Sequence, residues 1–282
     1  METPAQEAPV YSSIIVPLDG SAAAARALPP AVTLAQEAHV PLVAMTVTTP
    51  SFASSTTDRI REQIAAAGMR YPTIELLLSS LPPADPLLAA LNRRPGSLLV
   101  MTTHGHSHIG QLLGGTAESI LRARTGPSLL IGPSCDADVF KPTGRLVIPV
   151  DGSEVGESVL PLAAAWSVSF PFEPEVVSVI DPEVETLLAI SGDIGSESGV
   201  PSRAAASLEA TTGLTVDWRV LHDDRPADGI VRRAIDADAS LIAMSTHGRT
   251  GLGRVLMGSV ATEVVHKAPC PVLFHRPPGL RG

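Results

Sequence analysis

The sequence predicts an α/β protein built from two copies of one doubly wound domain. Apolar residues make up 44% of the 282-residue chain but aromatic residues only 3%, so the cores must consist of Ala, Val, Leu and Ile. Such cores are typical of parallel sheets covered by helices on both faces. Short apolar runs alternate with Ala-rich helical segments. An internal repeat is the third observation, and at roughly 150 residues per domain the length also fits two domains.

The internal repeat consists of short segments that recur at two spacings. IIVPLDGS at 14–21 returns as LVIPVDGS at 146–153, which is 132 residues later. LLVMTTHG at 98–105 returns as LIAMSTHG at 241–248, which is 143 residues later. The second copy therefore carries 11 extra residues, and we expect them in the polar surface stretch 191–199.

The repeat divides the chain into domains at 10–134 and 143–277, each with five expected strands. Apolar runs of strand length occur at 13–18, 42–47, 74–78, 97–102 and 128–131, and again at 145–150, 175–180, 214–220, 240–245 and 271–275. Helical segments such as 22–38 lie between them, and Pro29 and Pro30 must break or kink this one. Strands joined by helices imply right-handed crossovers and a doubly wound parallel sheet in each domain.

Two polar features follow strand ends in each copy. Asp19 and Asp151 follow the first strand, and the tripeptide Thr-His-Gly follows the fourth. In open parallel sheets, ligands bind beyond the carboxyl ends of the strands, where the strand order reverses. A glycine-bearing loop and a helix come next, for which we expect Thr116 and Ser259 as N-caps. A helix N-terminus suits a phosphate, but a plain capped helix after a loop explains the same residues.

At these positions the chain resembles the universal stress protein family, over nearly its whole length and as two consecutive domains. ATP-binding members of that family carry Gly-x2-Gly-x9-Gly-[Ser/Thr] after the fourth strand and an Asp after the first. Both copies keep this spacing, with a hydroxyl residue in place of the first glycine. The copies read Thr102-Thr-His-Gly105, nine residues, Gly115-Thr116, and Ser245-Thr-His-Gly248, nine residues, Gly258-Ser259.

The resemblance implies a role for each matching residue. Adenine and ribose contacts would come from Asp19, Asp151, Val47 and Val179. Phosphate contacts would come from Thr102, Gly105, Gly115 and Thr116 in the first copy and from Ser245, His247, Gly248, Arg249, Gly258, Ser259 and Val260 in the second. Each aspartate has a simpler interpretation as a helix cap together with Ser21 or Ser153, and each valine as strand core.

The resemblance also implies a ligand and an assembly. The ligand would be ATP, or AMP or ADP, with Mg²⁺ as a companion ion. The strand order would be 3-2-1-4-5, and the last strands of the two domains would pair to form an intramolecular pseudo-dimer, with a homodimer as a further assembly. Between its loop glycines the second copy carries Arg249 and Arg254, whereas the first has only His106 and His108. We therefore expect the second domain to bind ATP more tightly, unless these arginines are ordinary solvated charges.

Three functional hypotheses follow from these residues. The first is a nucleotide-responsive regulatory protein of the stress response, and the second is a nucleotide-free interaction module that keeps the loops as scaffold. The third is an enzyme that slowly hydrolyses ATP, for which only His104 or His247 offers a general base. Because no GxSxG or HExxH pattern occurs, we predict no catalytic residue. The HGHSH run has no nearby Asp, Glu or Cys to complete a metal site.

Charge and cysteine content exclude other classes. The chain has 20 Lys and Arg against 29 Asp and Glu, a net charge of −9, which argues against a nucleic-acid surface. Cys135 and Cys270 cannot form a disulfide framework, so we expect a reducing cytoplasm. The N-terminus lacks the pattern of a signal peptide and no run of 18 apolar residues occurs, so we expect neither export nor a membrane span.

Overall fold

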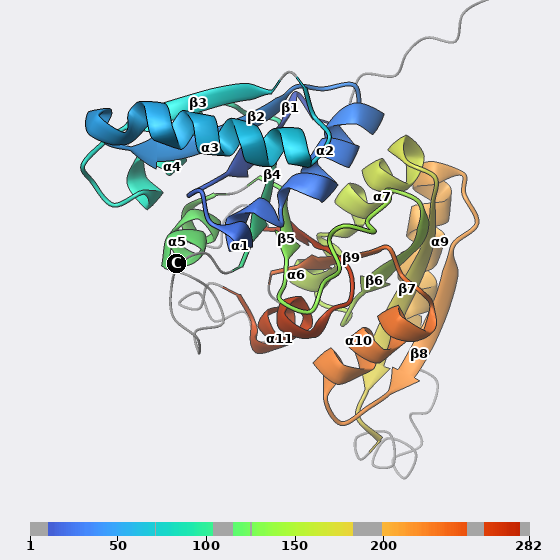
Figure 1. Cartoon of the computed structure of the whole chain (residues 1–282). Helices are drawn as coiled ribbons and strands as arrows, with labels where there is room; N and C mark the ends of the chain where they lie inside the picture. Colours follow the sequence, from blue (N-terminus) through green and yellow to red (C-terminus); the bar gives the residue numbers. More distant parts are fainter. Residues whose placement is uncertain are drawn as a thin grey trace, which may run out of the picture.

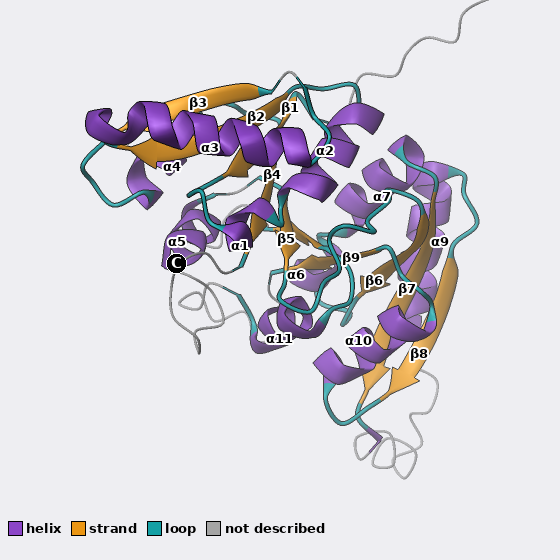
Figure 2. Ribbon diagram, in the orientation of Figure 1, coloured by secondary structure: helices purple, strands orange, loops and turns teal. Residues whose placement is uncertain are grey.

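The computed structural model describes residues 11–70, 72–103, 115–124, 126–182, 199–246 and 257–276, and strands and helices alternate along them (Figures 1 and 2). The first half contains β1 (Ser13–Pro17), α1 (Ala22–Ala25), α2 (Leu28–Glu37), β2 (Leu42–Thr48), η1 (Pro50–Phe52), α3 (Ala53–Ala66), β3 (Thr73–Leu78), α4 (Ala84–Asn92), β4 (Ser97–Thr102), α5 (Gly115–Ala123) and β5 (Ser128–Ile131). The second half contains β6 (Gly144–Pro149), α6 (Glu154–Glu157), α7 (Leu160–Ser169), β7 (Phe172–Ile180), α9 (Gly199–Thr212), β8 (Asp217–His222), α10 (Pro226–Asp236), β9 (Leu241–Ser245), α11 (Ser259–Lys267) and β10 (Val272–His275).

The described strands form one ten-stranded sheet in the order β3-β2-β1-β4-β5-β10-β9-β6-β7-β8. Within each half all neighbouring strands are parallel, and each half has the predicted order 3-2-1-4-5. The halves join through β5 and β10, which pair antiparallel with Leu129 opposite Leu273. The predicted fold class and the intramolecular pseudo-dimer through the last strands are therefore confirmed.

Alternation of side chains along the strands divides the interior into two cores. Ile14 faces one core and Ile15 the other, as expected for successive residues of a strand. The first core lies under α1, α2, α3, α7 and α9, and the second under α4, α5, α10 and α11. Both cores run through the two halves of the chain, so each face of the sheet is covered by helices of both domains.

Two expectations about element bounds have different outcomes. The segment 22–38 is broken as predicted, because α1 ends at Ala25 and Pro29 and Pro30 lie in the first turn of α2, where proline is tolerated. The strand expected at 214–220 was placed too early, since it runs over Asp217–His222. Gly213 adopts φ +70°, and the Val216 N–H donates to Glu209 Oε1 at 3.0 Å. These residues therefore form the turn out of α9, and pairing with β7 begins at Asp217.

The junction between the halves is close-packed at backbone level. A Cβ at Gly132 would lie 1.8 Å from the carbonyl oxygen of Val265 in α11, so only glycine fits after β5. On the other side of the junction, Arg276 follows β10 and its Nη1 donates to the carbonyl oxygens of Leu121 and Arg122. These carbonyls belong to the last turn of α5, which has no further helical donors for them. The junction thus uses a glycine on one side and an arginine cap on the other.

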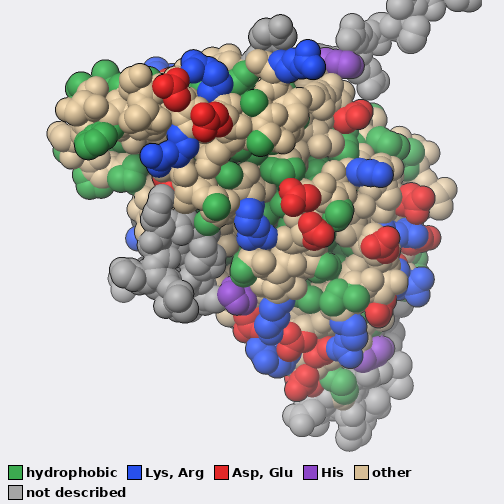
Figure 3. All heavy atoms as spheres, viewed as in Figure 1, with side chains coloured by type: hydrophobic (Ala, Val, Ile, Leu, Met, Phe, Trp, Pro, Cys, Tyr) green, Lys and Arg blue, Asp and Glu red, His purple; other side chains and the backbone are tan. Residues whose placement is uncertain are grey.

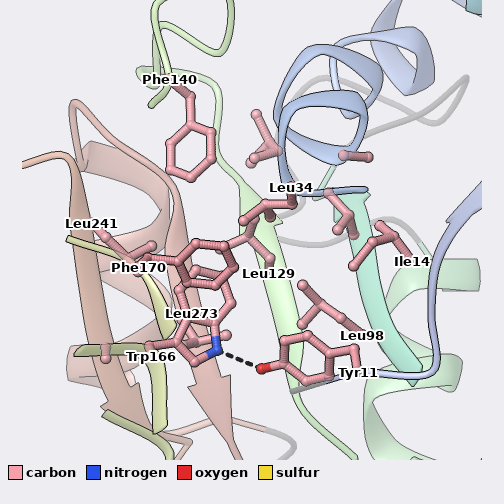
Figure 4. Packing of buried hydrophobic residues seen from close by; sticks show 14 of the residues in the cluster. Tyr11, Ile14, Leu34, Leu98, Leu129, Phe140, Trp166, Phe170, Leu241 and Leu273 are labelled. Atoms are coloured by element: carbon pink, nitrogen blue, oxygen red, sulfur yellow. Dashed lines mark hydrogen bonds between the residues drawn. The ribbon is translucent and has the colours of Figure 1, made fainter. Parts of the chain in front are cut away.

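An aromatic cluster closes the first core between the halves (Figure 4). Trp166 of α7 is fully buried, and its ring lies 5.2 Å from Phe170 and 6.1 Å from Tyr11, centre to centre. Its Nε1–H donates to the hydroxyl oxygen of Tyr11, which precedes β1. Burial raises the pKa of this phenol. Four of the chain's nine aromatic residues, Tyr11, Trp166, Phe170 and Phe172, therefore form one cluster where the first domain meets the second.

Gly132→Ala should destabilise the whole chain, because the new methyl group can be accommodated only by moving the backbone of α11. We expect a loss of about 1–3 kcal/mol in the free energy of unfolding, measured by urea denaturation. Gly199→Ala is the matched control, since a Cβ there has nothing within 4 Å. Identical urea midpoints for Gly132→Ala and the unaltered chain would contradict the close packing.

Tyr11→Phe should lower the free energy of unfolding by about 1–3 kcal/mol, because it leaves the buried Trp166 N–H without its acceptor. Thermal unfolding measures the loss. A double-mutant cycle with Trp166→Phe supplies the control, since the Tyr11 hydroxyl has no donor to accept from in that background. Additive losses in the cycle would mean that the hydrogen bond does not couple the two domains.

Candidate functional site

In the second domain, the connections that follow β6 and β9 lie on opposite faces of the sheet. The chain leaves β6 toward α6 and α7 on the face of the first core, and leaves β9 toward α11 on the face of the second. β6 and β9 are neighbours, with Val147 opposite Ile242. The same relation holds for β1 and β4 in the first domain. Each domain therefore has a topological switch point, the place where ligands bind in open α/β sheets.

Ser153 holds Asp151 in the turn after β6 by two hydrogen bonds and also caps the helix that follows. Asp151 Oδ1 accepts from the Ser153 N–H at 3.0 Å and from the Ser153 hydroxyl at 2.6 Å. Ser153 Oγ in turn accepts from the Gly156 N–H at 3.0 Å, as an N-cap of α6. In the first domain, Ser21 caps α1 in the same way and Asp19 accepts from the Ser21 N–H at 2.9 Å. The capping interpretation of both aspartates is confirmed by the structure.

The two aspartates differ in how closely they approach the following helix. A Cβ at Gly156 would lie 2.2 Å from Asp151 Oδ1, so the carboxylate occupies the space that a side chain would need. The residue at the corresponding position of the repeat is Ala24, which is buried. Asp19 is exposed, whereas Asp151 is half-buried. Gly156 therefore lets the second domain hold its aspartate against the helix.

Helix α11 begins directly at the switch point. The Gly258 N–H donates to the Thr246 carbonyl at 2.8 Å, which ties the helix start to the end of β9. Gly258 is the N-cap, and the first helical bond runs from the Thr262 N–H to the Gly258 carbonyl at 3.0 Å. The N–H groups of Ser259, Val260 and Ala261 thus have no partner within the helix. They give this end of α11 a partial positive charge.

The expected caps Ser259 and Thr116 were wrong. Ser259 is the first residue of α11 rather than its cap, and Gly258 makes no side-chain bond because it has no side chain. α5 already includes Gly115, so Thr116 lies inside its first turn. Glycine is accepted at N-cap positions, and here it also permits the close bond to Thr246. Gly115 and Gly258 therefore mark the helix starts, one residue before the position expected for each cap.

Ser245 ends β9 with a buried hydroxyl. The residue is 5% exposed, and its buried Oγ has no hydrogen-bond partner among the residues that the structure describes. An unsatisfied buried hydroxyl costs roughly 1–3 kcal/mol, so its presence in a native structure calls for an explanation such as a role in a site. Thr102 occupies the same position in the first domain and is also buried. The hydroxyl residues that replace the first glycine of the family pattern therefore point into the protein.

Val47 and Val179 lie at the carboxyl ends of β2 and β7, half-buried against the second core. Val179 packs against Gly229 of α10, where a Cβ would be 3.0 Å from Val179 Cγ1. The strand-core interpretation of both valines is thus correct for their side chains, while their backbone lies at the ligand edge of the sheet.

Two residues near the switch points were missed by sequence reasoning. Arg59 reaches from α3 to the turn after β1, where its Cδ and Nη1 lie 3.1 and 3.2 Å from the Cβ position of Gly20. The first domain therefore has a cation close to Asp19. His275 ends β10 in register with Ser245 on β9. The repeat hides His275, because the first domain has no histidine in its last strand.

Several predicted residues lie outside the described part of the chain. These are Gly105, His247, Gly248 and Arg249, together with His104, His106, His108, Arg254 and residues 191–198 of the insertion expected at 191–199, whose last residue begins α9. Among the residues that the structure describes, no three metal-ligating side chains gather in one place. No helix in this part of the chain has the length and hydropathy of a membrane span.

Charged side chains on and next to α10 and α11 are paired. Basic and acidic groups lie intermixed over α10 and α11 (Figure 3). Lys267 Nζ lies 2.6 Å from Asp228 Oδ1 and 3.2 Å from Glu263 Oε2, and Arg225 Nη2 lies 2.7 Å from the same Glu263 oxygen. Hydrogen bonds to Lys267 lower the pKa of Asp228, and the same contacts raise the pKa of Lys267. The carboxylates near the end of α11 are therefore neutralised by neighbouring cations.

The fold and its switch points define a class of α/β proteins with one candidate ligand site in each half. Comparison with known proteins identifies the family. A sequence model of the Universal stress protein family matches residues 11–131 and 142–276. The chain belongs to this family, with two consecutive domains.

Individual relatives agree with this assignment. A universal stress protein of Methanocaldococcus jannaschii is 33% identical over 143 residues, covering 48% of this chain and 82% of its own length. One of Mycobacterium tuberculosis is 30% identical over 186 residues, covering 64% of this chain and 61% of its own length. The crystal structure of a universal stress protein from Archaeoglobus fulgidus superimposes with a TM-score of 0.66 at 16% identity, covering 96% of this chain and 99% of the other. This last similarity concerns the fold.

Gly156→Ala should push the Asp151 carboxylate out of its place against α6, because the methyl group and Oδ1 cannot both occupy it. We expect a crystal structure of the variant to show Asp151 turned toward solvent, as Asp19 is. We also expect a decrease of about 1 kcal/mol in the free energy of unfolding from the weakened cap. Ala24→Gly is the reciprocal control in the first domain. An unmoved Asp151 would show that Gly156 does not determine its position.

Proposed function

We propose that this protein binds an adenine nucleotide at its switch points and acts as a nucleotide-responsive regulatory protein of the stress response. ATP is the favoured ligand, with AMP and ADP as the alternatives. The observation that carries the proposal is the convergence of Asp151, Ser245 and the start of α11 at the carboxyl ends of β6 and β9. A polar ligand with both a hydrogen-bonding base and phosphates suits this combination.

The described residues fit such a ligand in three respects. The N–H groups at the start of α11 face the place where a phosphate gains most from the helix dipole. The buried Ser245 hydroxyl needs a partner. Asp151 keeps a carboxylate at the opposite side of the switch point, held by its turn. Gly258, Ser259, Val260 and Ser245 would therefore hold phosphate oxygens, and Asp151 and the end of β7 at Val179 would hold the nucleoside.

We propose further that the second domain is the stronger site. Gly156 leaves room for the Asp151 carboxylate against α6, where the first domain has Ala24 and a more exposed aspartate. Arg249 and Arg254 precede α11 in the sequence and would add cations for the phosphates. Arg59 favours binding by the first domain instead, because it brings a cation to that site. It approaches the turn of Asp19, so we assign it to the nucleoside side of that site.

Isothermal titration with ATP and AMP tests the proposal on paired variants. Gly258→Glu places a carboxylate at the start of α11 and should lower the affinity of the tighter site at least tenfold, which is about 1.4 kcal/mol. Gly115→Glu should remove only the weaker binding. Gly199→Glu adds the same charge at the start of α9, where a side chain has open space, and should leave binding unchanged.

Two results would overturn parts of the proposal. Equal losses from Gly258→Glu and Gly115→Glu would contradict the stronger second site. No heat of binding and no rise in Tm of the unaltered chain with millimolar ATP would favour a nucleotide-free interaction module, since a ligand specific for the folded state stabilises it by about 2.7 kcal/mol at 100 times its Kd.

A further inference from the structure

His275 and Ser245 project from neighbouring strands on the same face of the sheet. Leu241 and Ala243 of β9 belong to the first core, and Ile242 and Met244 to the second, so Ser245 faces the side of the first core. Leu273 of β10 faces the first core, and so does His275 two residues later. The two residues are in register, and adjacent strands lie about 4.8 Å apart. The histidine and the serine are therefore side by side at the ligand edge.

The backbone fixes this pair at the end of the sheet. The Thr246 N–H donates to the His275 carbonyl at 3.1 Å, just as the Thr103 N–H donates to the Ile131 carbonyl at 3.2 Å. Ile131 is thus the counterpart of His275 in the first domain. One domain has a hydroxyl residue beside an apolar side chain, and the other has a hydroxyl residue beside an imidazole. This difference is independent of the loops that precede α5 and α11.

Partial burial of an imidazole at this position costs free energy, which a polar partner offsets. His275 is half-buried, and burial lowers its pKa below the ordinary value. Ser245 Oγ is buried beside it without a partner among the described residues. The first domain has an isoleucine at the position of His275. Burying an imidazole there, next to a hydroxyl without a partner, costs folding free energy that the isoleucine does not. A ligand that accepts hydrogen bonds from both would satisfy them together.

We propose that Ser245 and His275 form a phosphate-binding pair specific to the second domain, in which the serine hydroxyl and an imidazole N–H donate to oxygens of the nucleotide's first phosphate. A phosphate is favoured over the base because Ser245 directly precedes Thr246, whose carbonyl holds the start of α11. The helix N-terminus and the pair then approach the same anion from two sides. This inference rests on the proposed nucleotide binding, and it adds a recognition element that the family pattern lacks.

Titration of adenosine, AMP and ATP into the full chain carrying Gly115→Glu tests the pair with the first domain blocked. His275→Ile, which copies the first domain, should weaken AMP and ATP three- to tenfold and leave adenosine unchanged. Ser245→Ala should do the same. His266→Ile makes the same substitution on the exposed side of α11 and should change none of the three affinities. Circular dichroism and Tm without ligand show whether each variant folds.

The outcomes separate this inference from the function on which it rests. If the Gly115→Glu chain binds no nucleotide, the proposed function fails at the second domain. If it binds AMP and His275→Ile binds it equally well, only the pair is wrong. Equal losses for adenosine and AMP also overturn the pair, because the contact would then not be to phosphate. If His275→Ile does not fold, the His275 ring ¹⁵N shifts of the unaltered chain decide, since the proposal requires them to change with AMP and not with adenosine.

Discussion

The antiparallel pairing of β5 with β10 is the constraint on which the rest of the structure depends. It joins two five-stranded parallel sheets into one sheet of ten strands, and it covers the strand edge that each domain would otherwise expose. Because α11 packs directly on Gly132, and Arg276 caps α5, the junction fixes helices as well as strands. Trp166 and Tyr11 then join the two halves within the first core, on one face of the sheet. Each domain therefore supplies part of the core of the other.

The same pairing determines where the candidate sites lie. Since β5 and β10 run in opposite directions, the strands of the two domains have their carboxyl ends on opposite sides of the sheet, measured along the strand direction. Each switch point is consequently separate, and each is bounded on one side by the last strand of its own domain. Small differences at these last strands and first turns make the copies unequal. The second domain has His275 and Gly156 where the first has Ile131 and Ala24. In the first domain, Arg59 approaches the turn after β1.

The fold was largely predictable from the sequence, whereas the positions of Arg59 and His275 near the sites were not. The repeat and the apolar runs indicated the strands, because buried parallel strands have a simple pattern, and the family resemblance supplied their order. The β8 bounds were misjudged because the turn that follows Gly213 contains Leu214 and Val216, which look like the start of an apolar strand. Arg59 and His275 act through contacts between distant segments, and a motif read along the chain contains no signal for such contacts. The caps failed for a local reason, since Gly258 takes the place expected for a serine.

An acidic chain can still offer a favourable place for a phosphate if its carboxylates are occupied elsewhere. Glu175 is fully buried in β7, and Arg233 binds it through Nε at 2.8 Å and Nη2 at 2.9 Å, while Arg219 Nε lies at 2.7 Å. Asp228 and Glu263 are likewise paired with Lys267 and Arg225. The net charge of −9 therefore does not describe the electrostatic potential at the ends of β6 and β9. The hydrogen-bond donors near these ends determine how well a phosphate binds, because interactions between exposed charges farther apart than about 8–10 Å are largely screened by salt.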